Sequence, residues 1–343
     1  MPVKGAIIGF GHIAANGHVP AYLANPDIRI QAVCDSHPER KEVNDRLLKD
    51  SRFYLSADEL LEREDVDFVD VSTPPSLHAP FILKALSAGR HVLCEKPLIL
   101  DSGDLLNIYR MMKQSGKTVV TVHNWRYSPI LQEVSQLLRQ GTIGRIRRIE
   151  YLVTRTRPSV AVGEDASCNW RLDPSVAGGG ILVDHGWHAF YLVNEWAGSS
   201  PRRVECRLEN RKFQDIQVED TAEVLFSYRD GEARLFFTWA GKERNNTVSI
   251  RGDRGRIDVM DDTIRMENGT GTREITFSEG LSAGSHHPDW YGAVIREFLA
   301  EMTDTRLSGR NFHEAACCFN LLRHCMKSSS RGTEVEVRDW KDA

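Results

Sequence analysis

The residues VKGAIIGFGHIA (3–14) decide the fold of this chain. A short apolar run ends in Gly9, Gly11 and Ala14, which give the spacing GxGxxA between an expected strand and an expected helix. The first glycine permits a tight turn and the second lets the backbone approach a pyrophosphate. The third small residue allows close packing of helix on strand. The pattern therefore predicts the first unit of a dinucleotide-binding domain.

The following segments alternate short apolar runs with helical stretches up to about residue 124. The runs are rich in valine and isoleucine, as expected of parallel strands that are buried on both faces. They are IRIQAVCD, DFVDVST, RHVLCEK and KTVVTVH. Repeated βαβ units of this kind predict a Rossmann-type domain with a parallel sheet over residues 1–124.

After Asn124 the pattern changes to longer strands in which polar and apolar residues alternate. Turn signals such as YRDGEA and RGDRGR separate them, which is typical of antiparallel hairpins. The expected helices of this part lie near residues 128–140, 177–197, 288–303 and 311–327. Because 343 residues are too many for one ordinary core, we expect an α/β protein with a second domain over residues 125–343.

The composition argues against several classes of protein. The formal charge is −4, and the basic stretch from Arg139 to Arg157 lacks the interleaved aromatic residues of a nucleic-acid site. Seven cysteines form no CxxC pair, which favours a reducing compartment. No signal peptide is recognised, and no apolar run approaches the roughly 18 residues of a membrane-spanning helix. We expect a cytoplasmic enzyme that binds neither nucleic acid nor a membrane.

A carboxylate ends the second strand, where the adenosine ribose of a dinucleotide would bind. Asp35 lies twenty-one residues after Ala14 and would repel the 2′-phosphate of NADP, so NAD is favoured over NADP. His37 and Arg40 lie nearby and could soften that preference; a structural turn followed by a capping aspartate stays the alternative. The expected cofactor contacts of this region are Gly9, Gly11, His12, Ile13, Asp35 and Arg40.

A lysine ends a later strand, in the segment LCEKP (93–97). Ligands of a doubly wound sheet bind at the carboxyl ends of the strands, so Lys96 is expected beside whatever the first strand binds. Ser72, Thr73 and Pro74 follow the third strand and are expected to line the nicotinamide side of the same crevice. A nucleotide loop and a lysine in one crevice indicate chemistry as well as binding.

The segment GGGILVDHGWHAFYL (178–192) supplies the other candidate catalytic groups. On a helix, Asp184 and His188 are four residues apart and share one face, where the carboxylate can orient the imidazole. Oxidation of a secondary alcohol needs a base for the hydroxyl proton, and a lysine ammonium stabilises the developing alkoxide. Lys96, Asp184 and His188 supply such a set, which predicts a dehydrogenase or reductase acting on CH–OH groups.

Two other interpretations of this segment stay open. An aspartate–histidine pair on a helix is often a capping or packing pair. His185 and His188 could also be metal ligands, but no third ligand has a recognisable spacing, so no metal is expected. His286 and His287 precede Pro288 and are expected in a loop at a helix start, with no assigned role.

The chain resembles the glucose–fructose oxidoreductase, inositol dehydrogenase and rhizopine-catabolism family (Gfo/Idh/MocA). The matching segments are IIGFGHIA, TPPSLHAPFILKALSAGRHVLCEKPL and NWRLDPSVAGGGILVDHGWH. The EKP block combined with the AGGG–D–H block is specific to this family, far more so than the glycine loop, which occurs in many nucleotide-binding proteins. The resemblance implies a Rossmann domain followed by an α/β domain with a large, open, mostly antiparallel sheet, which usually builds homodimers or homotetramers.

The resemblance also implies roles for individual residues. Lys96 and His188 would be catalytic and Asp184 would assist, while Glu95 and Pro97 would shape the lysine turn. The resemblance places His78, Glu95 and Asn124 near the cofactor. It places Arg126 and Trp170 at the border of the substrate cleft.

Two residues depart from the family pattern. Pro75 stands where asparagine is usual, and Tyr191 stands where the family often has an aspartate three residues after the catalytic histidine. The first departure affects a cofactor contact, and the second affects a contact of the histidine or of the substrate.

The implied substrate is a sugar, inositol or related polyol. Arg155 and Arg157 are expected on one strand face with Tyr151 and Val153, where they would select a phosphate or carboxylate on the substrate. That face could instead meet solvent or a second subunit. Besides a dehydrogenase, two hypotheses stay open: a glycoside hydrolase that retains its NAD, and a non-catalytic NAD-sensing regulatory protein.

Overall fold

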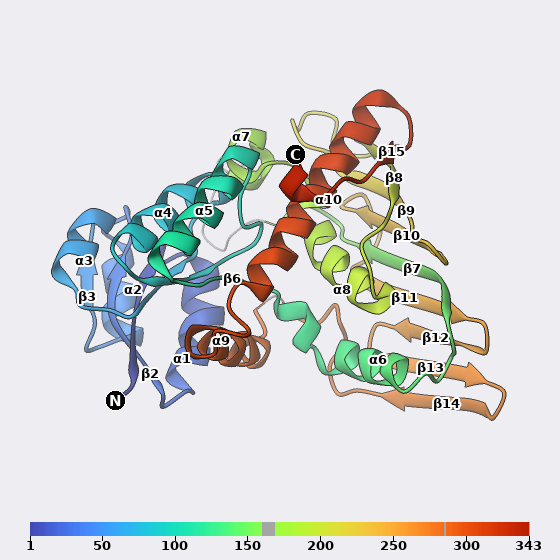
Figure 1. The fold of residues 1–343 in the computed structure, drawn as a ribbon, viewed down its shortest axis with the longest axis horizontal. Helices are drawn as coiled ribbons and strands as arrows, with labels where there is room; N and C mark the ends of the chain where they lie inside the picture. The colour runs from blue at the N-terminus through green and yellow to red at the C-terminus, as the bar shows by residue number, and fades with distance from the viewer. Residues whose placement is uncertain (160–168, 285, 343) are drawn as a thin grey trace. The chain divides into compact units, whose positions relative to one another are not determined.

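The computed structural model describes residues 1–159, 169–284 and 286–342. Contacts within the chain divide it into two compact units, of which the first contains residues 1–124 and 286–316 and the second contains residues 125–285 and 317–343. Figure 1 shows the ribbon coloured along the chain.

A six-stranded parallel sheet forms the centre of the first unit, with the strand order β3-β2-β1-β4-β5-β6. Its strands are β1 (Val3–Ile8), β2 (Ile28–Cys34), β3 (Arg52–Tyr54), β4 (Phe68–Val71), β5 (His91–Cys94) and β6 (Val119–Thr121). This is the order of a dinucleotide-binding Rossmann sheet, in which the direction of winding reverses between β1 and β4. The Rossmann domain predicted from the glycine loop is confirmed.

Helix α5 of this unit has recognisable start and stop signals. In α5 (Ser102–Ser115), the Asp101 side chain accepts from the backbone N–H of Gly103 at 2.7 Å, and Gly116 ends the helix with φ of +66°. The other helical segments are η1 (Ala14–His18), α1 (Val19–Leu23), α2 (Arg40–Leu47), α3 (Ala57–Arg63), η2 (Pro75–Leu77), α4 (His78–Ser87) and α9 (Pro288–Thr303). The turn η1, directly after the glycine loop, is π-helical.

Helix α9 belongs to the first compact unit although it follows residue 285 in the chain. Its apolar face buries Val294 and Phe298, and the Phe298 ring lies 5.2 Å from that of Phe68 in β4. The predicted helix 288–303 is confirmed, but no pattern in the sequence indicates that it packs with the first sheet. The assignment of residues 1–124 and 125–343 to separate functional domains stays a prediction.

The second unit is built on a nine-stranded sheet with the order β14-β13-β12-β11-β7-β10-β9-β8-β15. The strands are β7 (Ile146–Thr154), β8 (Arg203–Glu209), β9 (Thr221–Ser227), β10 (Glu232–Thr238), β11 (Asn245–Gly252), β12 (Gly255–Met260), β13 (Thr263–Asn268), β14 (Gly271–Thr276) and β15 (Val335–Glu336). Only the β7–β10 pair is parallel. The expected class, a Rossmann domain plus a large, mostly antiparallel sheet, is confirmed.

Side chains alternate along β7, so that Tyr151 and Val153 are buried on one face and Leu152 is exposed on the other. Helices α6 and α8 lie on one face of the sheet (Figure 1). The helical segments from residue 124 onward, α9 apart, are η3 (Asn124–Tyr127), α6 (Pro129–Arg139), η5 (Trp170–Leu172), α7 (Pro174–Ala177), η6 (Leu182–Gly186), α8 (Trp187–Ala197), α10 (Arg310–Arg331) and η7 (Trp340–Asp342). Within the described ranges, no helix has the length and apolar character needed to cross a membrane.

Candidate active site

The glycine loop joins β1 to η1 at the point where the sheet reverses its winding. Gly9 has φ of +90°, and a Cβ there would lie 2.8 Å from the carbonyl carbon of Ser72 and the amide nitrogen of Thr73. The position therefore requires glycine for both its backbone angle and its close approach to the segment after β4. At Gly11 a Cβ would meet no heavy atom within 4 Å. The surface over Gly11 is open, as the approach of a pyrophosphate requires.

Asp35 follows β2 and holds the glycine loop. One oxygen of its carboxylate accepts from the backbone N–H of Phe10 at 2.7 Å, and the other accepts from the N–H of His37 at 2.9 Å. The second oxygen also lies 3.1 Å from the His37 ring nitrogen, whereas the oxygen that accepts from Phe10 keeps a lone pair to which a ribose hydroxyl can donate. Arg40 is the first residue of α2 and is half-buried. The loop and the acid predicted to bind the dinucleotide are therefore in contact with each other.

The remaining predicted cofactor residues of this unit surround the same strand ends. The hydroxyl of Thr73 is buried without a hydrogen-bond partner, which leaves a polar group for a ligand to satisfy. His12 bonds Asn16 at 3.0 Å, and its ring packs edge-on against His286 with 4.5 Å between centroids. Asn124 is buried after β6. These residues fit an NAD site.

His78 lies behind this surface and is fully buried. Its ring nitrogens lie 2.8 Å from the carbonyl oxygens of Thr73 and Pro97, and burial lowers the pKa of its imidazole. The sequence placed His78 near the cofactor. In the structure it links the segment after β4 to the lysine turn after β5.

Lys96 follows β5 in a tight turn and is half-buried. Its backbone N–H donates to the Glu95 carboxylate at 3.0 Å, and the peptide bond between Lys96 and Pro97 is cis. Glu95 is itself buried and lies 3.0 Å from the ring of His18. The sequence interpretation did not single out His18, because its partners are 52 and 77 residues away along the chain.

In the second unit, aromatic residues hold His188, which is buried in α8. Its Nδ1 lies 3.1 Å from the Tyr191 hydroxyl, and the indole of Trp125 stacks on its ring at 5.3 Å. The same hydroxyl accepts from the backbone N–H of Trp125 at 3.2 Å. The Arg126 guanidinium lies over the Tyr191 ring at 5.3 Å and bonds Glu195 at 3.3 Å. Tyr191, the departure from the family pattern, is thus a direct partner of the histidine.

Asp184 lies one turn before His188, in η6, and its carboxylate is 3.6 Å from the ring of His185. The sequence predicted one regular helix over 177–197, in which Asp184 and His188 share a face. The structure interrupts that helix with a π-helical turn, which rotates side chains relative to α-helical spacing. A sequence periodicity cannot show such a turn.

The glycine triplet before this turn packs against the chain itself. A Cβ at Gly180 would overlap the backbone of Glu219, whose carbonyl accepts from the N–H of Ile181 at 3.1 Å. The Glu219 carboxylate accepts from the N–H of Leu182 at 3.0 Å, and burial raises its pKa. Gly180 thus brings the Glu219 loop against the turn that carries Asp184.

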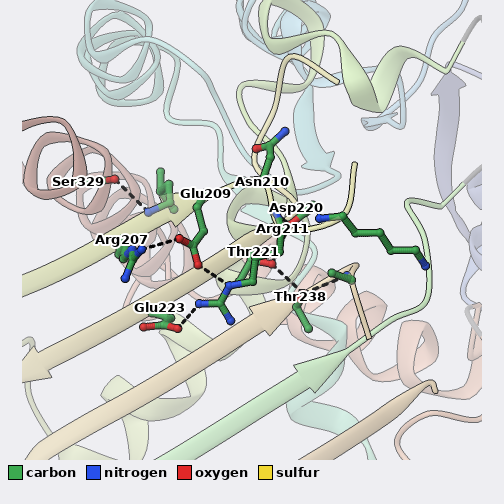
Figure 2. A network of polar contacts seen from close by, with 12 residues as sticks. Arg207, Glu209, Asn210, Arg211, Asp220, Thr221, Glu223, Thr238 and Ser329 are labelled. Atoms are coloured by element: carbon green, nitrogen blue, oxygen red, sulfur yellow. Dashed lines mark hydrogen bonds and ion pairs between the residues drawn. The ribbon is translucent and has the colours of Figure 1, made fainter. Parts of the chain in front are cut away.

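That loop is fixed by the polar network in Figure 2. Asp220 accepts from the backbone N–H groups of Arg211, Lys212 and Phe213 at 2.7–2.9 Å. The Arg211 side chain bonds both Glu209 and Glu223, and Thr221 bonds Thr238 at 2.8 Å. The network holds the residues around Glu219 in one conformation, and through Glu219 it supports the turn of Asp184.

Arg155 lies just beyond the end of β7 and is only 4% exposed. Its guanidinium donates to the carbonyl oxygens of Thr154 and Asn245, at 2.8 and 3.2 Å, and to the amide oxygen of Asn246 at 3.2 Å. Burial, and then the charge of Arg244, lower its pKa to about 10. Arg157 is exposed beyond the strand.

Trp170 and possible metal ligands complete the set of predicted site features. Trp170 is half-buried in η5, and its ring faces the guanidinium of Arg171 at 4.3 Å. In the part of the chain that the structure describes, no three His, Cys, Asp or Glu side chains gather as metal ligands would.

Comparisons with known proteins agree with the fold of both domains. The family model "Oxidoreductase family, NAD-binding Rossmann fold" matches residues 3–123, and the model "GFO/IDH/MocA C-terminal domain" matches residues 131–258. The matches confirm the resemblance, the Rossmann domain and NAD as the cofactor.

Similar proteins were found among curated sequences and solved structures. D-apiose dehydrogenase of Paraburkholderia graminis is 32% identical over 286 residues, which cover 80% of this chain and 72% of that protein. dTDP-3,4-didehydro-2,6-dideoxy-alpha-D-glucose 3-reductase of Actinomadura kijaniata is 30% identical over 75% of this chain and 74% of that protein. The structure of GenD2 from gentamicin A biosynthesis, in complex with NAD, has a TM-score of 0.83 at 22% identity and covers 98% of this chain and 97% of that one.

Proposed function

Because the chain belongs to the Gfo/Idh/MocA oxidoreductase family, we propose that it transfers a hydride between NAD and a hydroxyl-bearing carbon of a sugar, inositol or related polyol. Lys96 would stabilise the developing alkoxide and relay its proton. His188 would act as the general acid or base, assisted by Asp184. The relatives named as a D-apiose dehydrogenase and a deoxysugar 3-reductase favour a sugar-like substrate.

The observation that carries this proposal lies within the first unit. The turn of Lys96 is linked through His78 to Thr73, which packs against Gly9. The residues proposed to hold NAD are those of the glycine loop, Asp35 and the Ser72–Thr73 segment, and bound NAD supplies the hydride acceptor. A lysine tied to this segment supports the proposal of chemistry on a bound substrate, because a protein that only senses NAD has no need of it.

The Tyr191 hydroxyl supports a proton-transfer role for His188. A phenol can donate a hydrogen bond to Nδ1 or accept one from it, so the contact persists in both protonation states of the ring. The aspartate usual in the family can only accept. Tyr191 therefore keeps the ring oriented without adding a negative charge beside it.

Replacing Tyr191 with phenylalanine is expected to lower kcat about tenfold, with little change in NAD affinity, because His188 loses its oriented partner. Tyr191→Asp is expected to shift the pH optimum upward, since a carboxylate favours the imidazolium. Steady-state kinetics across pH measure both effects. A Tyr191→Phe enzyme with the parent's kcat and pH profile would contradict the role given to this hydroxyl.

The proposed substrates include sugar acids and sugar phosphates. The Arg155 guanidinium donates to the neutral oxygens of Thr154, Asn245 and Asn246, and its Nε is buried without a partner. A buried guanidinium of this kind favours an anionic ligand group, which it can bind with two parallel hydrogen bonds.

The proposal is tested by incubating the protein with NAD and a panel of sugars, inositols, sugar acids and their phosphates, while NADH absorbance is followed. NADH formation with one subset is expected, and the subset shows whether an anion is preferred. If NAD binds and no member reacts, the dehydrogenase proposal fails. Release of free sugar from glycosides without net NADH would then identify an NAD-retaining glycoside hydrolase.

We also propose that the protein is a cytoplasmic homo-oligomer. The face of the nine-stranded sheet that carries the exposed Leu152 offers a surface for a second subunit. Cys34, Cys94, Cys206 and Cys325 are buried free thiols, which supports a reducing compartment. Light scattering after size exclusion measures the mass, and a monomer would contradict the proposal.

A further inference from the structure

Five buried polar side chains form one hydrogen-bonded cluster in the first unit. They come from η1, α1, β4, the turn after β5 and α9, and each is less than a tenth exposed; they are His18, Tyr22, Asp70, Glu95 and Tyr291. His18 is at the centre of the cluster. Its Nδ1 lies 2.6 Å from a carboxylate oxygen of Asp70, and its Nε2 lies 3.0 Å from one of Glu95.

The two tyrosines complete the cluster from opposite sides. The Tyr22 hydroxyl donates to Asp70 at 2.8 Å, and the Tyr291 hydroxyl donates to Glu95. The Tyr291 ring also packs against the His18 ring, with 4.2 Å between centroids. One oxygen of each carboxylate therefore has two partners, the His18 ring and a tyrosine hydroxyl.

This geometry defines the protonation state of His18. A neutral imidazole has one N–H, so it could donate to only one of the two carboxylates and would turn a lone pair toward the other. Two buried carboxylates, one on each ring nitrogen, therefore require the doubly protonated, cationic ring. Burial alone would lower the pKa of His18, but the charges and hydrogen bonds of Asp70 and Glu95 raise it to about 10.

The cluster also reaches the lysine turn. The second oxygen of the Glu95 carboxylate accepts from the backbone N–H of Lys96 at 3.0 Å. On the other side of the lysine, the carbonyl of Pro97 bonds His78 at 2.8 Å. Buried histidines thus hold the residue before Lys96 and the residue after it.

We propose that His18 is a positioning residue whose imidazolium bridges Asp70 and Glu95 and thereby ties the helix after the glycine loop to the turn that carries Lys96. Asp70 lies two residues before Ser72, in the strand that leads to the cofactor segment. One cation therefore holds the glycine-loop helix, the β4 end and the lysine turn together. The consequence for catalysis rests on the proposed role of Lys96, whereas the positioning itself does not.

The expected pH behaviour follows from the groups that face the ring. They are Asp70 in β4, Glu95 after β5, Tyr22 in α1 and Tyr291 in α9, with Lys96 beside Glu95. Although burial opposes it, the hydrogen bond from His18 lowers the pKa of Glu95 to about 2. The stabilisation from Glu95 is complete above pH 4.5 and is lost as pH falls through about 2. That from His18 is complete below pH 6.5 and is lost as pH rises through about 10.

The first test observes the ring itself. Protein labelled with ¹⁵N-histidine is titrated by NMR, and the His18 signal is assigned by its loss in the His18→Gln variant. One imidazole with both nitrogens protonated at about pH 8 is expected, well above the usual histidine range. A His18 ring with a single protonated nitrogen at neutral pH would overturn the proposal, whatever reaction the protein catalyses.

The second test observes the lysine turn by hydrogen exchange of the peptide that covers residues 93–99. In His18→Gln this peptide is expected to exchange at least about tenfold faster, because Glu95 loses its cationic partner. Tyr22→Phe is the matched control: it removes a hydrogen bond to Asp70 but leaves the ring between the carboxylates, so exchange stays within about twofold. Equal exchange in His18→Gln and the parent would refute the positioning role.

The pH dependence of the melting temperature distinguishes loss of the positioning role of His18 from a general loss of stability. In His18→Gln the two buried carboxylates lose the cation between them, which raises their pKa values, so the melting temperature is expected to fall between about pH 5 and about pH 8, while that of the parent does not. Adding Asp70→Asn removes one carboxylate and is expected to restore a flat pH profile and a folded protein. If His18→Gln does not fold, hydrogen exchange of residues 93–99 is measured in this double variant. A double variant with parental exchange in residues 93–99 would count against the proposal.

Discussion

Lys96→Ala is expected to lower kcat by roughly 10³-fold or more while NAD affinity changes by less than about tenfold. The ammonium is proposed to stabilise the developing alkoxide and to relay its proton, and alanine supplies neither. The glycine loop and Asp35, which are proposed to hold NAD, do not depend on this side chain. Single-turnover kinetics with the substrate from the panel, and calorimetric NAD titration, measure the two quantities separately.

His188→Ala is expected to behave in the same way, since it removes the proposed acid or base and leaves the nucleotide fold intact. Lys84→Ala is a suitable control, because Lys84 pairs with Asp58 on the surface of the same unit. Its kcat should equal that of the parent. Loss of NAD binding in Lys96→Ala or His188→Ala would assign these residues to the cofactor site and would contradict their catalytic role.

Gly9→Ala is expected to abolish NAD binding and to lower the free energy of unfolding by about 2 kcal/mol or more. The left-handed backbone angle of Gly9 is unfavourable for alanine, and the new Cβ would lie 2.8 Å from the backbone of Ser72 and Thr73. Neither of these backbone atoms can move without displacing the end of β4. Chemical denaturation and NAD titration measure the two losses.

Gly11→Ala provides the comparison at the same loop. Its Cβ would enter open space, so the free energy of unfolding should change by less than about 1 kcal/mol. The methyl group would nevertheless occupy the surface that a pyrophosphate approaches, and NAD affinity should fall at least about tenfold. If Gly11→Ala binds NAD as tightly as the parent, the pyrophosphate does not lie over Gly11.

The sequence was sufficient for features that depend on local patterns. The glycine loop, the valine-rich strands and the turn signals predicted both sheets, and the helix 288–303 was placed correctly. Features that depend on contacts distant in sequence were not predicted. His18 meets Glu95 across 77 residues and Tyr291 meets Glu95 across 196, so no periodicity or motif could connect them.

In the second unit, too, contacts between residues distant in sequence led to features that sequence patterns did not predict. The π-helical turn at 182–186 lies in a segment whose spacing is compatible with a regular helix, and Glu219, which packs on Gly180 beside this turn, comes from a distant loop. Likewise, alternation predicted Arg155 on a strand face, but β7 ends at Thr154, and only the fold shows that the guanidinium is buried among neutral oxygens.

The hydrogen bond between Asp35 and the backbone of Phe10 has a consequence for how NAD is captured. The acid holds the glycine loop in its binding shape before any dinucleotide arrives. The entropy lost in ordering that loop is therefore part of folding and does not reduce the affinity for NAD. An incoming ribose would need only to occupy the lone pair left on the oxygen that accepts from Phe10, so NAD would bind to a loop that is already ordered.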